Sequence, residues 1–183
     1  EPEVLALDCE MCYGESGLEL CRVSLLNFAG ETLIDTLVAP KNKIIDYNTD
    51  FSGISPGDLD SPDLPTYEQV RQQLIDRISP DSYLIGHGLD SDLRILQLFH
   101  YRCIDTSFLY PTSEGLPRKY KLKHLASKYL GKKIQARIGA SCGHDSAEDA
   151  RAAIDLVKLK CVQESRKRCE EMPPTLRVCF PNY

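Results

Sequence analysis

Residues 4–12 read Val-Leu-Ala-Leu-Asp-Cys-Glu-Met-Cys, and this stretch decides the fold. Side chains alternate between the two faces of a β-strand, so Asp8 and Glu10 share one face while Leu5 and Leu7 share the other. The remaining residues on both faces are mostly apolar, which predicts a strand at the centre of a sheet. Two carboxylates on such a strand are costly to bury unless a cation or partner compensates their charge.

Short apolar stretches separated by turn signals lie on either side of a long middle segment. Strands are expected at residues 19–28 and 32–38, and the turn at 27–30 between them favours an antiparallel meander. Two later strands are expected at 82–86 and 102–106. Three meander strands followed by alternating helices and strands predict a mixed α/β sheet of five strands, flanked by helices.

Helical spacing of apolar residues predicts four helices. They cover residues 66–78, 89–100, 122–130 and 145–162. Thr66 suits the first N-cap, and Gly131 stands where a C-terminal stop belongs. The segment 39–65 holds four prolines and is expected to be a long ordered loop. We expect one domain over residues 1–162 and a C-terminal tail, residues 163–183, that packs on it or begins a linker.

Composition excludes several classes of protein. The 183 residues fit one domain, and the 42% apolar and 27% charged fractions are ordinary for a soluble globular protein. No stretch approaches the ~20 apolar residues of a membrane span, so no membrane partner is expected. The 22 Lys and Arg against 27 Asp and Glu give a net charge of −5. That charge argues mildly against a protein that coats nucleic acid, which would usually be basic.

The eight cysteines do not predict a disulfide framework. Five of them lie in apolar stretches, where a free cysteine packs as a small hydrophobe: Cys9, Cys12, Cys21, Cys103 and Cys161. Cys161 is expected to face inward from the last helix. This placement favours a reduced, intracellular protein. The Cys9-x-x-Cys12 pair has no second pair at zinc-ligand spacing, which argues against a metal or redox role.

Three further acids lie where strands end or helices begin. Asp90 and Asp92 follow the strand expected at 82–86, at the carboxyl end where sites gather in α/β sheets. Asp90 also suits an N-cap, and a helix dipole favours Asp92 in the first turn. Asp149 forms a capping-box pattern with Ser146. Each acid therefore has a structural interpretation beside a functional one.

Taken together, the acids point to a shared site. Four carboxylates on three elements near one sheet edge suit two divalent cations such as Mg²⁺, which prefer oxygen ligands. Two such ions promote in-line phosphoryl displacement, and a neutral His144 would accept a proton from water. Residues 115–144 hold eight basic side chains and no acid, which favours a surface that follows phosphates. Ordinary surface acids and a solvated helix face are the alternative interpretation.

Six segments resemble the DEDDh exonucleases, and within them the Rex-type RNA exonucleases. The segments are residues 5–12, 46–54, 84–93, 104–107, 109–111 and 143–151. The resemblance runs over nearly the whole chain, from about Val4 to Lys160. It implies a ribonuclease H-like fold, 3′-to-5′ exonuclease activity and two bound Mg²⁺ or Mn²⁺ ions.

The resemblance also implies roles for single residues. Asp8 would bridge both metals, and Glu10 and Asp149 would complete the shell of the first. Asp92 would hold the second metal directly or through water. His144 would be the general base, because it stands five residues before Asp149, as in the His subgroup of the family.

Four residues match substrate-contacting positions of the family: Met11, Phe51, Ser52 and His87. Met11 resembles the residue that packs against the terminal nucleotide. Phe51 and Ser52 lie in a loop that resembles the wall near the 3′ end, and His87 would orient substrate or support its loop. Some relatives carry Arg where this chain has Asp50, which leaves a 2′-hydroxyl contact from that position open.

The sequence therefore predicts a metal-dependent 3′-to-5′ exoribonuclease. It would hydrolyse single-stranded RNA from a 3′-hydroxyl end and release nucleoside 5′-monophosphates, in RNA processing or turnover in the nucleus or nucleolus. Two alternatives stay open: a DNA-directed exonuclease on the same fold, and a non-catalytic RNA-binding domain. No protein partner follows from the sequence.

Overall fold

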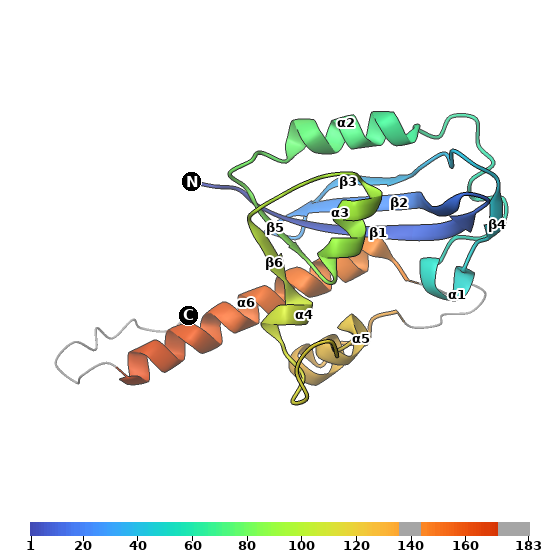
Figure 1. Cartoon of the computed structure of the whole chain (residues 1–183). Helices are drawn as coiled ribbons and strands as arrows, with labels where there is room; N and C mark the ends of the chain where they lie inside the picture. The colour runs from blue at the N-terminus through green and yellow to red at the C-terminus, as the bar shows by residue number, and fades with distance from the viewer. Residues whose placement is uncertain (136–143, 172–183) are drawn as a thin grey trace.

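A mixed six-stranded sheet forms the centre of the protein (Figure 1). The structure is a computed structural model that describes residues 1–135 and 144–171. The strands are β1 (Val4–Gly14), β2 (Gly17–Asn27), β3 (Thr32–Leu37), β4 (Ile44–Asp46), β5 (Tyr83–Gly86) and β6 (Cys103–Asp105). Their order is β3-β2-β1-β5-β6, with β4 paired to the end of β1. Strand β1 is central, as predicted, because it pairs antiparallel with β2 and parallel with β5.

Helices cover both faces of the sheet (Figure 1). They are α1 (Thr49–Ser52), α2 (Tyr67–Arg77), α3 (Leu89–Ile95), α4 (Thr106–Leu109), α5 (Leu122–Leu125), the π-helical turn η1 (Ala126–Leu130) and α6 (Ser146–Glu171). Leu5 and Leu7 of β1 pack in the cluster shared with α2 and α3. On the other face, Ala6 packs against α6, which presents Ala150 and Ala153 to the sheet. The predicted mixed α/β sheet flanked by helices is confirmed.

Local sequence signals set two helix ends as predicted. Thr66 caps α2 through a capping box: its hydroxyl accepts the Gln69 N–H at 3.3 Å, and the Gln69 side chain accepts the Thr66 N–H at 2.8 Å. Gly131 ends η1 in the left-handed region, with φ of 65°. None of the described helices has the length and apolar composition needed to cross a membrane.

Three predicted boundaries are wrong. The segment 39–65 is more than a loop, since it contains β4 and α1, and β4 makes the sheet six-stranded. The helix expected at 89–100 ends at Ile95, and Gln97 then adopts φ of 50°, which a helix cannot continue. The last helix runs to Glu171 instead of 162. The domain boundary at 162 stays a prediction, and residues 172–183 of the expected tail lie outside the described residues.

The cysteines divide into buried and exposed groups. Cys9, Cys12 and Cys21 are buried, as predicted. Cys103 and Cys161 are exposed, so their predicted burial is wrong. Cys103 lies on β6, at the edge of the sheet, and Cys161 lies on the part of α6 that extends beyond the sheet-covering residues.

The cap of α3 comes from a residue distant in sequence. Gly88 is its N-cap, with φ of 76°, so the prediction of Asp90 as N-cap is wrong. The Asp105 carboxylate accepts the N–H groups of Gly88 and Leu89 at 3.0 Å each, and that of Ser107 at 2.8 Å. Burial would raise the pKa of Asp105, but these N–H groups hold that pKa below its ordinary value. One carboxylate therefore fixes the starts of both α3 and α4.

The cap of α6 is shifted by one residue from the prediction. Asp145 caps the helix, because its Oδ1 accepts the N–H groups of Ala147 at 3.0 Å and Glu148 at 3.3 Å. The Ser146 hydroxyl instead lies 2.6 Å from the Ser24 hydroxyl of β2. The predicted Ser146–Asp149 capping box is therefore wrong. A capping role consequently does not explain the position of Asp149.

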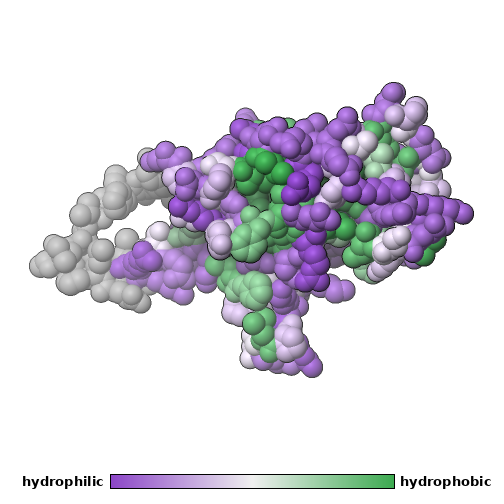
Figure 2. All heavy atoms as spheres, turned by 45° about the horizontal axis from the view of Figure 1, so that its top comes forward, coloured by the Kyte–Doolittle hydropathy of each residue, from purple (hydrophilic) through white to green (hydrophobic). Residues whose placement is uncertain are grey.

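The surface in Figure 2 is mostly hydrophilic, with hydrophobic side chains gathered near its middle. An apolar groove of about 270 Å³ lies between the end of α2 and the segment after α3. Phe99 and Tyr101 border it, are 80% and 86% exposed, and meet edge to face with ring centroids 4.6 Å apart. These residues precede β6, at the amino ends of the parallel strands.

Replacing Asp105 tests the shared cap. Asp105→Ala should lower the free energy of unfolding by roughly 2–4 kcal/mol, since three backbone N–H groups lose a charged acceptor. Urea unfolding measures the change. Asp90→Ala, at an exposed position in the first turn of α3, is the matched control and should stay within about 0.5 kcal/mol of the parent. Equal losses in the two variants would contradict the role given to Asp105.

Candidate active site

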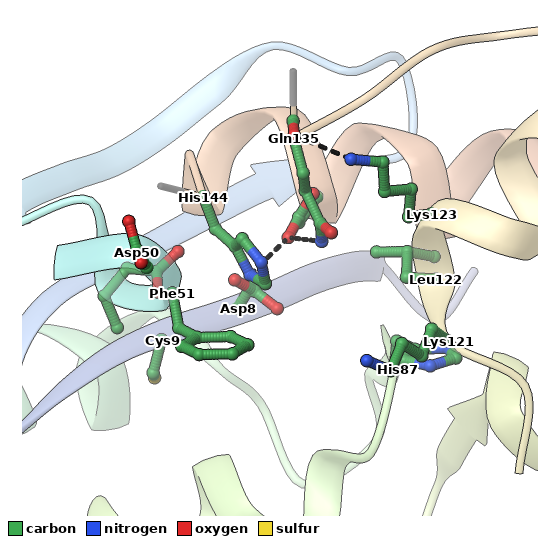
Figure 3. Close-up of a pocket in the computed structure, with 12 residues that line it drawn as sticks. Asp8, Cys9, Asp50, Phe51, His87, Lys121, Leu122, Lys123, Gln135 and His144 are labelled. Carbon is green, nitrogen blue, oxygen red and sulfur yellow. Dashed lines mark hydrogen bonds and ion pairs between the residues drawn. The ribbon is translucent and has the colours of Figure 1, made fainter. Parts of the chain in front are cut away.

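A cleft of about 560 Å³ opens over the middle of β1, where several elements meet (Figure 3). It is lined by Asp8, Cys9 and Glu10 of β1, Asp50 and Phe51 of α1, His87 after β5, Lys121, Leu122 and Lys123 at the start of α5, and Gln135, His144 and Asp149 before and within α6. The cleft thus draws its residues from segments far apart in the chain, as expected for a site at the carboxyl ends of parallel strands.

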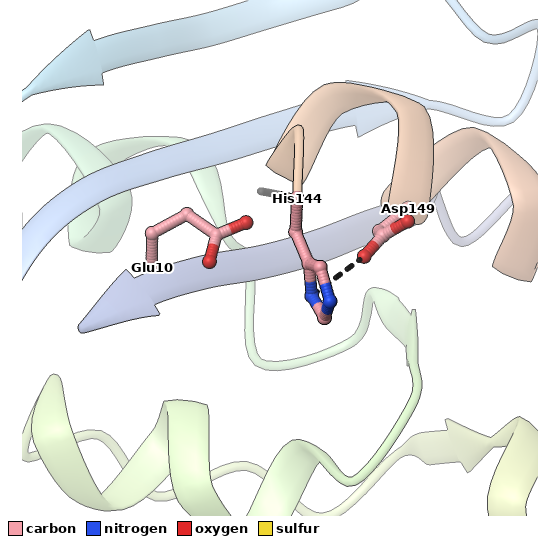
Figure 4. Close-up of side chains that lie close together, drawn as sticks. All are labelled: Glu10, His144 and Asp149. Atoms are coloured by element: carbon pink, nitrogen blue, oxygen red, sulfur yellow. Dashed lines mark ion pairs between the residues drawn. The ribbon is translucent and has the colours of Figure 1, made fainter. Parts of the chain in front are cut away.

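Carboxylates and an imidazole meet at the base of the cleft. Ligand-capable atoms of Glu10, His144 and Asp149 lie within 4.8 Å of one another (Figure 4). The Nδ1 of His144 lies 3.6 Å from the Oδ2 of Asp149. Asp8 joins them from the same strand face as Glu10. The structure therefore brings together four of the five predicted catalytic residues in direct contact with the cleft.

The fifth, Asp92, lies against the backbone of β1. It is 5% exposed, and its Oδ1 accepts the N–H of Cys9 at 3.1 Å. Its charge is close enough to Asp8 to raise the pKa of that carboxyl, after the larger effect of burial. The first turn of α3 thus delivers Asp92 to the acid cluster, and Asp90 of the same turn is exposed.

Burial raises the pKa of every acid in the cluster, and repulsion from the other cluster acids raises it further at Asp8 and Glu10. Burial, followed by the charge of Asp149, raises the pKa of Glu10 to about 9. Burial raises the pKa of Asp92 and Asp149 to about 7 each, and that of Asp8 well above its ordinary value. Such shifts mean that the charged forms lack compensation, which a divalent cation would supply.

The residues fit a divalent cation. Among the described residues, the Oε1 of Glu10 and the Oδ1 of Asp149 are buried and have no hydrogen-bond partner. Folded proteins seldom leave such oxygens without a partner. Carboxylate oxygens are the donors that Mg²⁺ and Mn²⁺ prefer. The orphaned oxygens therefore have the chemistry of metal ligands.

His144 is held by α1 through its backbone. Its N–H donates to the Phe51 carbonyl oxygen at 3.0 Å, and the Phe51 ring stands edge-on to the imidazole with centroids 6.1 Å apart. Gly53, with φ of 67°, lies so close that a Cβ there would be 2.5 Å from the His144 carbonyl oxygen. Burial, and then the charges of Lys123 and Lys121, lower the pKa of His144. The imidazole is thus neutral near pH 7, as a proton acceptor must be.

Gln135 is a cleft residue that the sequence did not single out. Its Nε2 donates to the Oδ2 of Asp149 at 2.7 Å, and its N–H donates to the Oε2 of Glu148 at 2.9 Å. Its carbonyl oxygen accepts a hydrogen bond from the Nζ of Lys123 at 3.1 Å. These bonds orient the Asp149 carboxylate. No motif marked Gln135, because its role depends on a φ of 53° and on contacts across the cleft.

The four predicted substrate contacts take different places. Phe51 and His87 line the cleft. Met11 packs against the core on the other face of the sheet. Ser52 is buried, and its hydroxyl donates to the Tyr47 carbonyl oxygen at 2.6 Å, which stabilises the turn that carries Phe51. Of the four, Phe51 and His87 are therefore the two that face the cleft.

Two of the eight predicted phosphate-tracking residues line the cleft, Lys121 and Lys123. Others pair with acids outside the basic segment, as Lys132 does with Asp155 at 2.6 Å. Arg137 lies outside the described residues. Acidic side chains therefore line the floor of the cleft, and the lysines line one wall. This arrangement suits a phosphodiester held beside a cation.

Comparisons with known proteins bear on this site. A family model described as “Exonuclease” matches residues 5–157. RNA exonuclease 5 of Homo sapiens is 45% identical over 155 residues, which cover 85% of this chain and 19% of that protein. RNA exonuclease 1 of Saccharomyces cerevisiae is 43% identical over 157 residues, 86% of this chain and 28% of that protein. The chain thus spans less than a third of either relative.

Solved structures agree with the fold. The Pan2 pseudoubiquitin hydrolase–RNA exonuclease module of Saccharomyces cerevisiae, solved in complex with AAGGA RNA, superposes with a TM-score of 0.77 at 26% identity. The match covers 91% of this chain and 30% of that one. The ribonuclease H-like fold that the sequence predicted is confirmed.

The clamp on His144 can be tested by stability. Gly53→Ala should lower the free energy of unfolding by roughly 2–4 kcal/mol, because the new methyl group meets the His144 backbone and the residue keeps a positive φ. Gly57→Ala is the matched control: its φ is 97°, but a Cβ there meets only Asp60, at 4.0 Å. It should cost about 1 kcal/mol. Urea unfolding of both variants measures the difference, and equal costs would rule out the clamp.

Stability should also depend on pH and metal together. The folded chain holds protons on its acids up to about pH 7–9, whereas the unfolded chain releases them near pH 4, so stability in EDTA should fall as pH rises between these limits. Mg²⁺ or Mn²⁺ should raise the melting temperature more at pH 8 than at pH 5.5, because cations bind the ionised carboxylates. Thermal melts measure both effects.

Glu10→Gln provides the matched variant for this test, since it keeps the shape of the side chain and removes a carboxyl whose pKa burial raises to about 9. It should flatten the fall of melting temperature with pH in EDTA. A melting temperature that does not respond to either metal at pH 8 would contradict the cation site.

Proposed function

The chain belongs to the exonuclease family whose model matches residues 5–157, and we propose that it is a 3′-to-5′ exoribonuclease acting on single-stranded RNA. The observation that carries the proposal is the acid cluster with its histidine at the base of one cleft. RNA as the substrate is supported by the names of the two relatives and by the RNA in the similar Pan2 module.

Exonucleases of this family depend in general on divalent metal, and two Mg²⁺ or Mn²⁺ ions are proposed here. Asp8 would contact both, Glu10 and Asp149 would hold the first, and Asp92 would hold the second directly or through water. Bound ions of this kind supply an activated water and stabilise the leaving oxygen. The orphaned oxygens of Glu10 and Asp149 support this ligand assignment.

The chain's own residues would bind substrate and move the proton. Lys121 and Lys123 attract the phosphodiester, and Phe51 forms the wall beside the terminal nucleotide. The Nδ1 of His144 faces Asp149, which leaves Nε2 to accept a proton from the attacking water. Water adds at phosphorus, the bond to the 3′-oxygen breaks, and that oxygen takes up a proton from solvent. The terminal residue therefore leaves as a nucleoside 5′-monophosphate, and the shortened chain keeps a 3′-hydroxyl.

Two alternatives predict different products. A DNA-directed exonuclease would shorten a DNA oligomer faster than the matched RNA. A non-catalytic RNA-binding domain would bind RNA without metal and release no product, which the complete set of acids and histidine argues against. A nuclear or nucleolar location, which the family resemblance implies, stays a prediction.

A gel time course with 5′-labelled single-stranded RNA tests the proposal. The protein with Mg²⁺ should give a ladder that shortens from the 3′ end, while EDTA or Asp8→Ala should lower the rate at least a thousandfold, about 4 kcal/mol of transition-state stabilisation. Asp63→Ala, an exposed acid away from the cleft, is the control and should act like the parent.

Matched substrates sharpen the same experiment. A DNA oligomer of the same sequence should be shortened more slowly, and a 3′-phosphorylated RNA should resist digestion. An intact RNA in every lane, with Mn²⁺ also supplied, would refute the enzymatic proposal. Degradation that survives Asp8→Ala would refute the role given to that residue.

A further inference from the structure

An aromatic ring and a lysine lie exposed beside the cleft. Phe108 on α4 is 52% exposed, whereas Thr106 and Ser107 of the same short helix are buried. The Nζ of Lys119 lies 4.1 Å from the centre of the Phe108 ring. The same Nζ lies 3.7 Å from Asp90. We call Phe108 and Lys119 the Phe108 platform.

The platform continues a wall of the cleft. His87 lines the cleft, and its Nδ1 lies 2.9 Å from the hydroxyl of Thr106, the first residue of the helix that carries Phe108. Lys119 is two residues from Lys121, which lines the cleft beside His87 (Figure 3). Phe108 is thus linked to His87 through the hydrogen bond of Thr106, and Lys119 is linked to Lys121 through one intervening residue.

The proposed site of the terminal nucleotide sets the direction in which a bound chain leaves the cleft. Phe51 and His144 lie on one side of the cleft, and His87 and Lys121 lie on the other (Figure 3). In the proposed function the terminal nucleotide is held at the Phe51 side. In the proposal, the rest of a strand leaves past His87 and Lys121, toward the platform.

We propose that the Phe108 platform binds nucleotides 5′ of the terminal nucleotide of a single-stranded RNA, by base stacking on Phe108 and phosphate pairing with Lys119. The inference rests on the proposed function and adds a second contact region to it. Aromatic side chains stack bases of any kind with about 1–3 kcal/mol per base, and lysine adds attraction to phosphate. Asp90 competes with the phosphate for Lys119, so it weakens the pairing of Lys119 with phosphate.

The platform makes substrate affinity depend on RNA length. In the proposal, a dinucleotide occupies the cleft alone, whereas a longer oligomer also reaches the platform. Because the contact lies outside the reacting atoms, it should change KM and leave kcat unaltered. A residue needed only for folding would change the kinetics of short and long substrates alike.

The test measures KM and kcat for RNA oligomers of about two to eight nucleotides on each variant. Phe108→Ala should raise KM roughly 5- to 150-fold for the longer oligomers and leave the dinucleotide unchanged. Phe108→Tyr should restore the parent KM, since it keeps an aromatic face. Asp90→Asn should lower KM for the longer oligomers only.

Phe99→Ala is the matched control, because Phe99 is also exposed, at 80%, but lies at the amino ends of the parallel strands. It should leave KM unchanged at every length. The proposal is overturned if Phe108→Ala raises KM equally for dinucleotide and octanucleotide, or changes KM at no length.

A binding measurement separates this inference from the proposed function. Fluorescence anisotropy of labelled oligomers, with Ca²⁺ in place of Mg²⁺, reports affinity without turnover. A parent protein that hydrolyses no RNA but loses octanucleotide affinity on Phe108→Ala would keep the platform and refute the activity. Active hydrolysis by the parent, together with an octanucleotide affinity that Phe108→Ala leaves unchanged, would support the activity and refute the platform.

Discussion

The burial of four like charges around one strand is the constraint on which the rest of the structure depends. Asp8 and Glu10 cannot leave the sheet without moving β1, whose other side chains fill the core on both faces. Asp92 and Asp149 are brought against them by the starts of two helices. The raised pKa values of these acids show that folding has placed them where ionisation is unfavourable without a cation. Core packing thus holds the four acids together although their burial and repulsion oppose it. A bound cation would relieve that repulsion.

Fixed positive charge moderates this repulsion from the neighbouring strand. Arg22 pairs across the sheet with Glu10, and its charge lowers the pKa of that carboxyl, against the larger effect of burial. Its guanidinium is held by Asp35 through two hydrogen bonds of 2.9 Å and lies 3.3 Å from the helix cap Asp145. The same contacts therefore orient β2, β3 and the start of α6, so the site's electrostatics and the framework's geometry are coupled.

The cleft has two chemically different sides, and each is set by contacts between distant segments. The side formed by α1 holds His144 through the Phe51 carbonyl and the close approach of Gly53. The opposite side joins His87 to α4 through Thr106. A substrate strand that enters between them would meet the firmly held imidazole of His144 at one end and the exposed ring of Phe108 at the other. Rigid support of this kind is what positions reacting groups without a cost at the moment of reaction.

The sequence by itself determined the central strand, the alternation that puts Asp8 and Glu10 on one face, and the helical spacing that predicted α2 and the start of α6. These features depend on near neighbours in the chain, whose spacing is fixed by the period of a strand or helix. Only the tertiary structure decided the cap of α3 by Asp105, the clamp on His144 and the contact of Gln135 with Asp149. Each of these contacts joins residues that are far apart in sequence. Local motifs are also ambiguous by one residue: the sequence suggested Ser146 as the cap of α6, whereas the structure uses Asp145. A hydrogen bond across the fold needs a defined distance and direction, which no spacing along the chain encodes.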